Sequence, residues 1–191
     1  MTTKIAIIGT GNVGSALQRG LQKAGYEVRS ASKDQSAATA AWADIVFLAV
    51  PFGAVKEVVA AIGEAVTGKT IVDVTNALTP DIQLAVGYTT SGAEELQKLL
   101  PQAKVVKSFN TVFAQHMSEG KVNGEQLTVF AAGDDEGARK AVLEIAKAIG
   151  FDAVDGGALK NARLLEPLAL FNIQLGYVLG LGPNMGFKLV H

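Results

Sequence analysis

The sequence contains no cysteine and only two histidines, His116 and His191, among its 191 residues. The absence of cysteine excludes disulfide bonds, thiolate zinc sites, iron–sulfur clusters and a cysteine nucleophile. Two histidines are too few for a metal site built from several imidazoles. We therefore expect no metal site.

The sequence also lacks an excess of positive or negative charge, and it has no long apolar run. Seventeen Lys and Arg residues against 18 Asp and Glu leave a net charge of −1, whereas a nucleic acid or an acidic membrane binds a basic surface. The most apolar stretch, 164–181, is interrupted by Glu166, Pro167, Asn172 and Gln174, so no segment reaches the length of a membrane span. The first residues lead directly into a strand-length apolar run and do not resemble a signal peptide. We expect a cytoplasmic protein without a nucleic-acid or membrane partner.

Short apolar runs alternate with longer helical patterns along the chain. Continuous apolarity is typical of strands covered on both faces, and strand–helix alternation indicates crossover connections between parallel strands. The sequence therefore predicts an α/β fold, a Rossmann-type doubly wound, mainly parallel sheet. The expected strands are 4–9, 27–30, 45–50, 70–74, 104–108, 127–132 and 152–154, and the expected helices are 13–24, 53–66, 93–100 and 136–149.

Two loops and a tail interrupt this alternation. Residues 76–92 and 111–126 show no clear period, and long loops in compact domains are often functional. After Asp155 the pattern becomes helical and strongly apolar. We expect a dinucleotide-binding domain over 1–155 and a small helical extension over 156–191, which packs on the acceptor site or forms the interface of a homodimer.

A glycine-rich motif of the form G-x-G-x-x-G follows the first predicted strand and opens the first predicted helix. This context makes the motif typical of dinucleotide binding, with the pyrophosphate at the helix N-terminus. The first glycine permits the tight turn, the second the approach of the pyrophosphate and the third close helix–strand packing. The motif residues are Gly9, Thr10, Gly11, Asn12, Val13 and Gly14.

The residues after the second predicted strand favour NADP over NAD. A carboxylate there holds the ribose diol of NAD, whereas small and basic residues admit the 2′-phosphate of NADP. Ser32 and Lys33 occupy this position and suit a phosphate. Asp34 is the competing feature, because it lies about 20 residues beyond the motif, where an NAD-binding acid is expected.

The ends of the other strands form the expected substrate side, because ligands bind beyond the carboxyl ends of parallel strands. These ends are rich in small polar and aromatic residues and poor in proton donors; Lys107 and His116 are the candidate acids. An acceptor ring that takes a hydride and delocalises the charge needs positioning more than acid catalysis. We expect a crevice among Pro51, Thr75, Asn76, Asn110 and Thr111, in which Phe52 and Phe109 either wall the ring or pack as ordinary core aromatics. The cofactor is expected to contact Val50, Pro51, Thr75 and Asn76.

Nearly the whole sequence resembles the coenzyme F420-dependent NADP reductase family, which shares its nucleotide domain with the STEAP metalloreductases. The motifs that carry the resemblance are the glycine motif, 49–52, 72–76, 107–111, 132–135 and 155–167. The resemblance implies that NADP binds through the glycine loop, Ser32 and Lys33, and that the nicotinamide stacks near Pro51. Archaeal members that use the deazaflavin carry a histidine where this sequence has Asn110. The hydride acceptor, F420, a flavin or another electron acceptor, therefore stays open, and we assign Asn110 a positioning role.

Two other functions compete with a hydride-transferring oxidoreductase. A non-catalytic NADP(H)-sensing module fits the shortage of acid–base residues equally well. An imine reductase like pyrroline-5-carboxylate reductase shares the nucleotide domain, but it needs a much longer helical domain than the residues that remain here.

Overall fold

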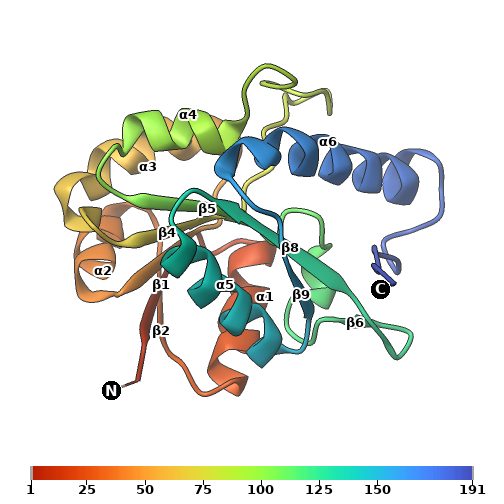
Figure 1. Ribbon diagram of the computed structural model, residues 1–191, viewed down its shortest axis with the longest axis horizontal. Helices are drawn as coiled ribbons and strands as arrows, with labels where there is room; N and C mark the ends of the chain where they lie inside the picture. The colour runs from red at the N-terminus through yellow and green to blue at the C-terminus, as the bar shows by residue number, and fades with distance from the viewer. Residues whose placement is uncertain (1, 191) are drawn as a thin grey trace.

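The structure is a computed structural model that describes residues 2–190. A seven-stranded sheet forms its middle layer, in the order β2-β1-β3-β4-β5-β8-β9 (Figure 1). The first five strands are parallel, whereas β8 is antiparallel to β5 and parallel to β9. The sheet strands are β1 (Lys4–Ile8), β2 (Glu27–Ala31), β3 (Ile45–Leu48), β4 (Thr70–Asp73), β5 (Lys104–Ser108), β8 (Thr128–Gly133) and β9 (Asp152–Asp155).

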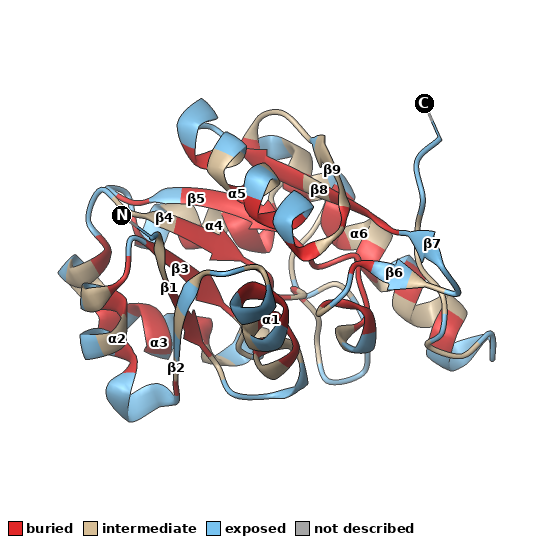
Figure 2. Cartoon of the chain, turned by 90° about the horizontal axis from the view of Figure 1, so that it is seen from below, coloured by how far each residue is buried: buried red, intermediate tan, exposed pale blue. Residues whose placement is uncertain are grey.

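Helices cover both faces of the sheet, as the doubly wound prediction requires. They are α1 (Asn12–Lys23), α2 (Ser36–Trp42), α3 (Val55–Ile62), α4 (Gly92–Leu99), α5 (Glu136–Ile149) and α6 (Ala162–Ile173). One core lies between the sheet and α1 with α5, and a second lies between the sheet and α2, α3 and α4. All four residues of β3 are buried, and Figure 2 shows the central strands β1, β3, β4 and β5 as a buried layer between half-exposed helices, whereas the edge strands β2 and β9 are partly exposed. The Rossmann-type fold is confirmed.

Local signals explain where the helices begin and end. The Asp135 side chain accepts a hydrogen bond from the backbone N–H of Ala138 (2.8 Å) and begins α5, and Gly150, with φ of 120°, ends it. Ser91 caps α4 in the same way through the N–H of Glu94 (3.1 Å). Such caps satisfy backbone groups that have no partner inside the helix.

Three features differ from the predicted elements. Helix α2 was not predicted, because its alanine-rich sequence shows no apolar period. The predicted helix 53–66 is broken into α3 flanked by short 3₁₀ turns, since Gly63 adopts φ of 41°. A short hairpin, β6 (Lys121–Val122) and β7 (Glu125–Gln126), lies within the predicted loop 111–126.

Within residues 2–190, no helix is both long enough and apolar enough to cross a bilayer. In the same part of the chain, no three His, Asp or Glu side chains gather in a way that would hold a metal ion.

Candidate functional site

The carboxyl ends of five parallel strands form one row across the sheet. Strand register aligns Ala31 with Ile8, Ile8 with Leu48, Leu48 with Asp73, and Asp73 with Lys107. Every residue that we predicted for the site follows one of these strand ends. The topology therefore brings the glycine loop, 32–33, 50–51, 75–76 and Asn110 to the same edge of the sheet.

The three glycines of the loop have different surroundings. A Cβ on Gly9 would lie 2.1 Å from the Ala49 carbonyl oxygen, and one on Gly14 would lie 2.0 Å from the Gly9 oxygen. Only glycine permits these approaches, and Gly9 also has φ of 123°. A Cβ on Gly11 would meet no heavy atom within 4 Å, so the space in front of this residue is open.

The N-terminus of α1 begins at Gly11 without a side-chain cap, and its first turn contains no acidic residue. The backbone N–H groups of the first turn, at 12–14, therefore point into the open space in front of the loop. Free N–H groups and the positive end of the helix dipole favour an anion. These features fit the pyrophosphate of a dinucleotide.

Ser32 and Lys33 leave the sheet beside the glycine loop, where the N–H of Gly9 donates to the Ala31 carbonyl (2.9 Å). Both side chains are exposed, and Lys33 forms an ion pair with Glu57 of α3. The hydrogen bond and charge of Glu57 raise the pKa of Lys33 above its ordinary value. Arg29 lies elsewhere, with its guanidinium 4.1 Å from the Trp42 ring centroid.

Val50 and Pro51 follow β3 and are half-buried and exposed, respectively. Thr75 and Asn76 follow β4, with Thr75 buried and Asn76 half-buried. The carboxamide oxygen of Asn76 is inaccessible and has no hydrogen-bond partner. A buried acceptor without a donor is rare in a folded protein, and a bound ligand is one source of the missing donor.

Asn110 is buried, and its amide Nδ2 donates to the Leu165 carbonyl of α6 (2.9 Å). A second amide on α6, that of Asn172, donates to the Thr111 carbonyl (3.1 Å). These two bonds join α6 to the loop after β5. Phe109 does not wall a crevice, because it is 1% exposed and packs in the core against Phe47 and Phe151; expecting it at the crevice was wrong.

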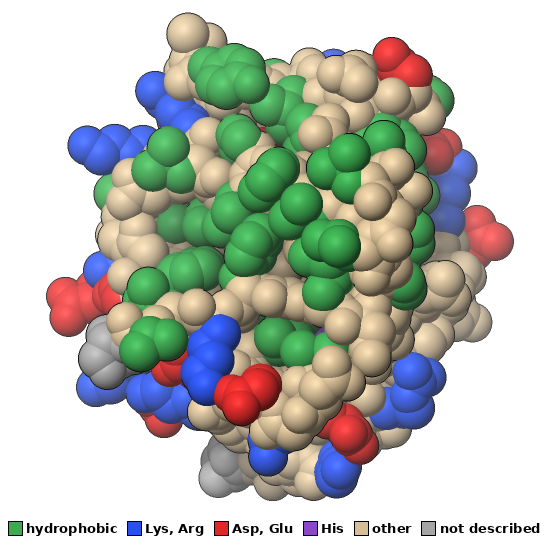
Figure 3. Space-filling model, turned by 90° about the vertical axis from the view of Figure 1, so that its right-hand side faces the viewer, with side chains coloured by type: hydrophobic (Ala, Val, Ile, Leu, Met, Phe, Trp, Pro, Cys, Tyr) green, Lys and Arg blue, Asp and Glu red, His purple; other side chains and the backbone are tan. Residues whose placement is uncertain are grey.

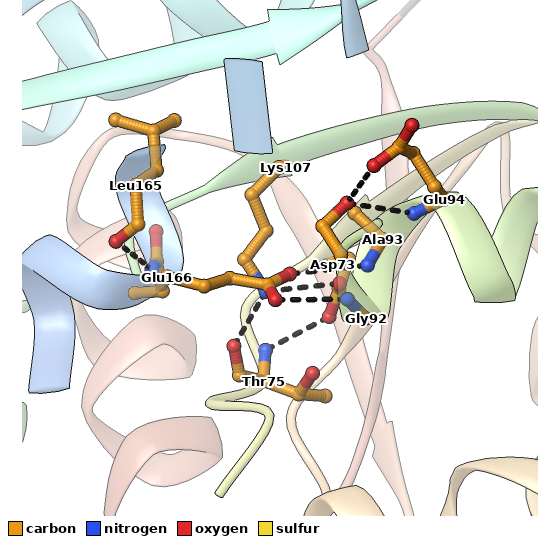
Figure 4. Close-up of polar contacts among 10 residues, drawn as sticks. Asp73, Thr75, Gly92, Ala93, Glu94, Lys107, Leu165 and Glu166 are labelled. Carbon is orange, nitrogen blue, oxygen red and sulfur yellow. Dashed lines mark hydrogen bonds and ion pairs between the residues drawn. The ribbon is translucent and has the colours of Figure 1, made fainter. Parts of the chain in front are cut away.

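A buried ionic cluster of Lys107, Asp73 and Glu166 lies directly behind this edge (Figure 4). Lys107 Nζ lies 3.0 Å from Asp73 Oδ2, 3.2 Å from Glu166 Oε1 and 2.6 Å from the Thr75 carbonyl oxygen. Burial alone lowers the pKa of Lys107, but the two carboxylates outweigh it and raise that pKa above its ordinary value. Lys107 therefore stays protonated, and its donors are committed to three acceptors inside the protein.

The other candidate acid, His116, also has a hydrogen-bond partner inside the protein. The His116 Nε2 atom lies 3.0 Å from the Pro183 carbonyl oxygen. A carbonyl accepts only, so this nitrogen carries the proton and donates it within the protein.

Two cavities differ in their relation to this edge. A cavity of 730 Å³ between the C-terminal ends of α3 and α4 opens at the opposite edge, where β4 and β5 begin. A hollow of 270 Å³ lies beside the glycine loop and is lined by Asn12, Ser15, Arg19, Ala114 and Gln115. Its location, rather than its size, associates the second cavity with the site.

Comparison with known proteins gives the class of this fold and site. The sequence matches the family described as NADP oxidoreductase, coenzyme F420-dependent, over residues 4–42 and 33–77. An F420-dependent NADP reductase of Methanothermobacter thermautotrophicus is 30% identical over 92% of this chain and 90% of its own length. A crystal structure from Arthrobacter sp. FB24, provisionally described as an F420-dependent NADP reductase, superposes with a TM-score of 0.92. It is 30% identical and covers 99% of this chain and 100% of its own.

The fold and the strand-end site thus define an NADP-dependent oxidoreductase with a Rossmann-type fold. The chain belongs to the F420-dependent NADP reductase family. Rat metalloreductase STEAP3 is also 30% identical over 87% of this chain, but the chain spans only 36% of that protein. An Aspergillus terreus reductive aminase, 19% identical with a TM-score of 0.68 over 94% of this chain and 63% of its own, shows the fold alone.

Sequence reasoning missed three residues of this edge. Glu57 and Glu166 lie on helices far along the chain from the residues they contact, and Asp73 was seen only as part of a strand. A charged residue at a predicted buried position was the available signal, because a buried charge needs a partner.

Proposed function

We propose that this protein transfers a hydride between NADP(H) and a flat conjugated acceptor, the deazaflavin F420 or a flavin. The observation that carries the proposal is the edge itself, where an open, uncapped glycine loop adjoins a surface whose proton donors are committed. Such an edge suits an acceptor that delocalises its charge and needs no acid.

The cofactor role falls on the residues at the strand ends. In this proposal the backbone N–H groups of the glycine loop bind the pyrophosphate, and Ser32 and Lys33 bind the 2′-phosphate. Val50 and Pro51 lie against the nicotinamide ring, and Thr75 and Asn76 receive its carboxamide, whose N–H₂ is a donor for the free Asn76 oxygen. Bound NADPH supplies the hydride.

Asn110 acts as a positioning residue in this scheme. The hydrogen bond from its side-chain amide to the Leu165 carbonyl fixes the first turn of α6 against the loop after β5, and the acceptor ring lies beside this contact. Removing this amide removes one of the contacts that hold α6 against this loop.

The test uses NADPH deuterated on one face of the nicotinamide C4 and F420 or a flavin under single-turnover conditions. We expect label transfer from one face only, and slower transfer in Asn110→Ala at saturating NADPH. Tight NADPH binding without reduction of any such acceptor contradicts the proposal and favours the sensing module.

We also propose a homodimer that buries the exposed apolar side of the C-terminal segment. Figure 3 shows hydrophobic side chains gathered on the side where α6 ends. An apolar surface of this kind on a folded domain usually contacts a partner. Its exposed members in this segment are Leu164, Phe171, Tyr177, Val178, Leu179 and Leu181.

Sedimentation velocity tests the dimer. The wild-type protein should sediment as a dimer and Phe171→Glu as a monomer, whereas the control Leu99→Glu, an exposed leucine on α4, should stay dimeric. A monomeric wild-type protein at micromolar concentration overturns this proposal.

A further inference from the structure

Lys107, Asp73 and Glu166 form a charged cluster in the protein interior, where apolar side chains are usual. Lys107 is 0% exposed and the two carboxylate side chains are each 1% exposed. Replacing a buried ion cluster with well-packed apolar residues is often neutral or stabilising. Stability alone therefore does not account for these three residues. Their role follows from the other groups that they bind.

The cluster fixes both polar backbone atoms of Thr75. Lys107 Nζ donates to the Thr75 carbonyl (2.6 Å), and the Thr75 N–H donates to Asp73 Oδ1 (2.9 Å). The turn that follows β4 is thereby held from both sides by side chains that are themselves buried and paired with each other. The next residue along this turn is Asn76, whose buried carboxamide oxygen has no partner.

Glu166 connects the same cluster to two helices. Its Oε2 accepts from the N–H of Gly92 (2.8 Å) and its Oε1 from the N–H of Ala93 (3.1 Å), at the start of α4. These backbone donors compensate the excess negative charge of one ammonium and two carboxylates. Since Glu166 belongs to α6, the position of the Thr75–Asn76 turn depends on where α6 lies (Figure 4).

We propose that Lys107 and Glu166 are positioning residues that hold the Thr75–Asn76 turn in the geometry that receives the nicotinamide half of the cofactor. Through Glu166, this geometry is tied to α6, the helix that Asn110 also holds. The inference rests on the proposed function, because it takes the nicotinamide to lie at this turn. It differs from the proposed role of Asn110, which concerns the acceptor.

Two ligands separate this role from a purely structural one. NADP⁺ contains both halves of the cofactor, whereas 2′-phospho-ADP-ribose lacks the nicotinamide. The dissociation constant of 2′-phospho-ADP-ribose divided by that of NADP⁺ is a ratio that measures what the nicotinamide half adds to binding. A general loss of stability weakens the binding of both ligands and leaves the ratio unchanged. A displaced Thr75–Asn76 turn weakens the binding of NADP⁺ alone.

The experiment compares wild type, Glu166→Gln and Lys107→Met by calorimetric titration with each ligand. We expect either variant to reduce the ratio about fivefold, the effect of one misplaced hydrogen bond. Glu94→Gln is the matched control: Glu94 also joins α4 to α6, through Arg163 (2.7 Å), but does not touch Thr75, so its ratio should equal that of wild type. Glu166→Gln keeps the side-chain volume and decides the outcome if Lys107→Met does not fold.

The outcomes distinguish the inference from the proposed function. If wild type binds neither ligand, the proposed function fails. If wild type binds both but Glu166→Gln leaves the ratio unchanged, or lowers it no more than Glu94→Gln does, the positioning role is wrong while the proposed function stands.

Discussion

Replacing Gly11 with valine should abolish cofactor binding without unfolding the protein. A Cβ at this position meets no heavy atom within 4 Å, and the backbone angles, φ −75° and ψ −167°, are extended and suit valine. Valine is a poorer N-cap than glycine by about 0.5–1 kcal/mol. It also reduces the freedom of the unfolded chain, which contributes about 0.4–1 kcal/mol in the other direction. The two effects nearly cancel, so the melting temperature should change by no more than about 3 °C.

The effect of the same substitution on binding is much larger. The added side chain fills the open space that the pyrophosphate would occupy. Two charge-assisted hydrogen bonds from backbone N–H groups contribute about 1.5–3 kcal/mol each. Their loss weakens NADPH binding by about 10²- to 10⁴-fold, since 1.4 kcal/mol is a factor of ten.

Gly14→Ala is the matched comparison, because it should reduce the stability of the fold, whereas Gly11→Val should reduce only cofactor binding. Its Cβ would lie 2.0 Å from the Gly9 carbonyl oxygen, and a backbone atom cannot move aside as a side chain does. Overpacking of this kind costs about 1–3 kcal/mol, and this contact belongs at the upper end. Thermal denaturation and calorimetry with NADPH measure both variants. Full NADPH affinity in Gly11→Val refutes the assignment of the loop.

Three further predictions concern the charged residues of the site and its surroundings. The double variant Ser32→Ala, Lys33→Ala should weaken NADPH about tenfold or more and NADH little, because charge-assisted phosphate contacts are lost; equal weakening of both cofactors in titrations places the 2′-phosphate elsewhere. Glu57→Gln should strengthen NADPH binding about threefold at low salt, because Lys33 no longer has to break its ion pair with Glu57 to bind the phosphate. The same gain in the Lys33→Ala background contradicts this reasoning. A hydrogen bond from Arg163 holds the pKa of Glu94 below its ordinary value of 4.5, so the pair adds stability above that pH and loses it as the pH falls through the folded-state pKa. Glu94→Gln should therefore lower the melting temperature at pH 7 and reduce the fall of the melting temperature with decreasing pH below pH 4.5. If that fall is the same as in wild type, the Glu94–Arg163 pair does not contribute the inferred stability.

The sheet could be predicted from the sequence because burial on both faces leaves a local signal. Runs such as Ile45–Leu48 are continuously apolar, and their order along the chain implies the crossovers. The direction of β8 could not be predicted in the same way, because a buried strand has the same pattern in either direction. Helix α2 was missed because alanine packs against a sheet without producing an apolar period.

The glycine loop could be predicted because its chemistry is contained in six consecutive residues. Glu166 could not, since the sequence places it 59 positions after Lys107 and no local pattern pairs a glutamate with a lysine at that separation. Phe109 illustrates the converse error: its position after β5 suggested the crevice, but it has φ of 63° and its ring packs in the core. Position at a strand end does not by itself determine where a side chain points.

The antiparallel strand β8 has a consequence for how such an enzyme diversifies. Because β8 is antiparallel to β5 and β9 is parallel to β8, Asp155 pairs with Ala131, which pairs with Ser108 at the strand-end row. The chain therefore enters the segment that leads into α6 from this same edge of the sheet. In the proposed function, residues before 111 supply the nucleotide contacts, and a separate, later stretch supplies the surface facing them. Substitutions in that later stretch reshape one wall of the crevice and leave the nucleotide fingerprint intact. On α6 the contacts that must be kept are those of Arg163, the Leu165 carbonyl, Glu166 and Asn172, which bind residues of other segments.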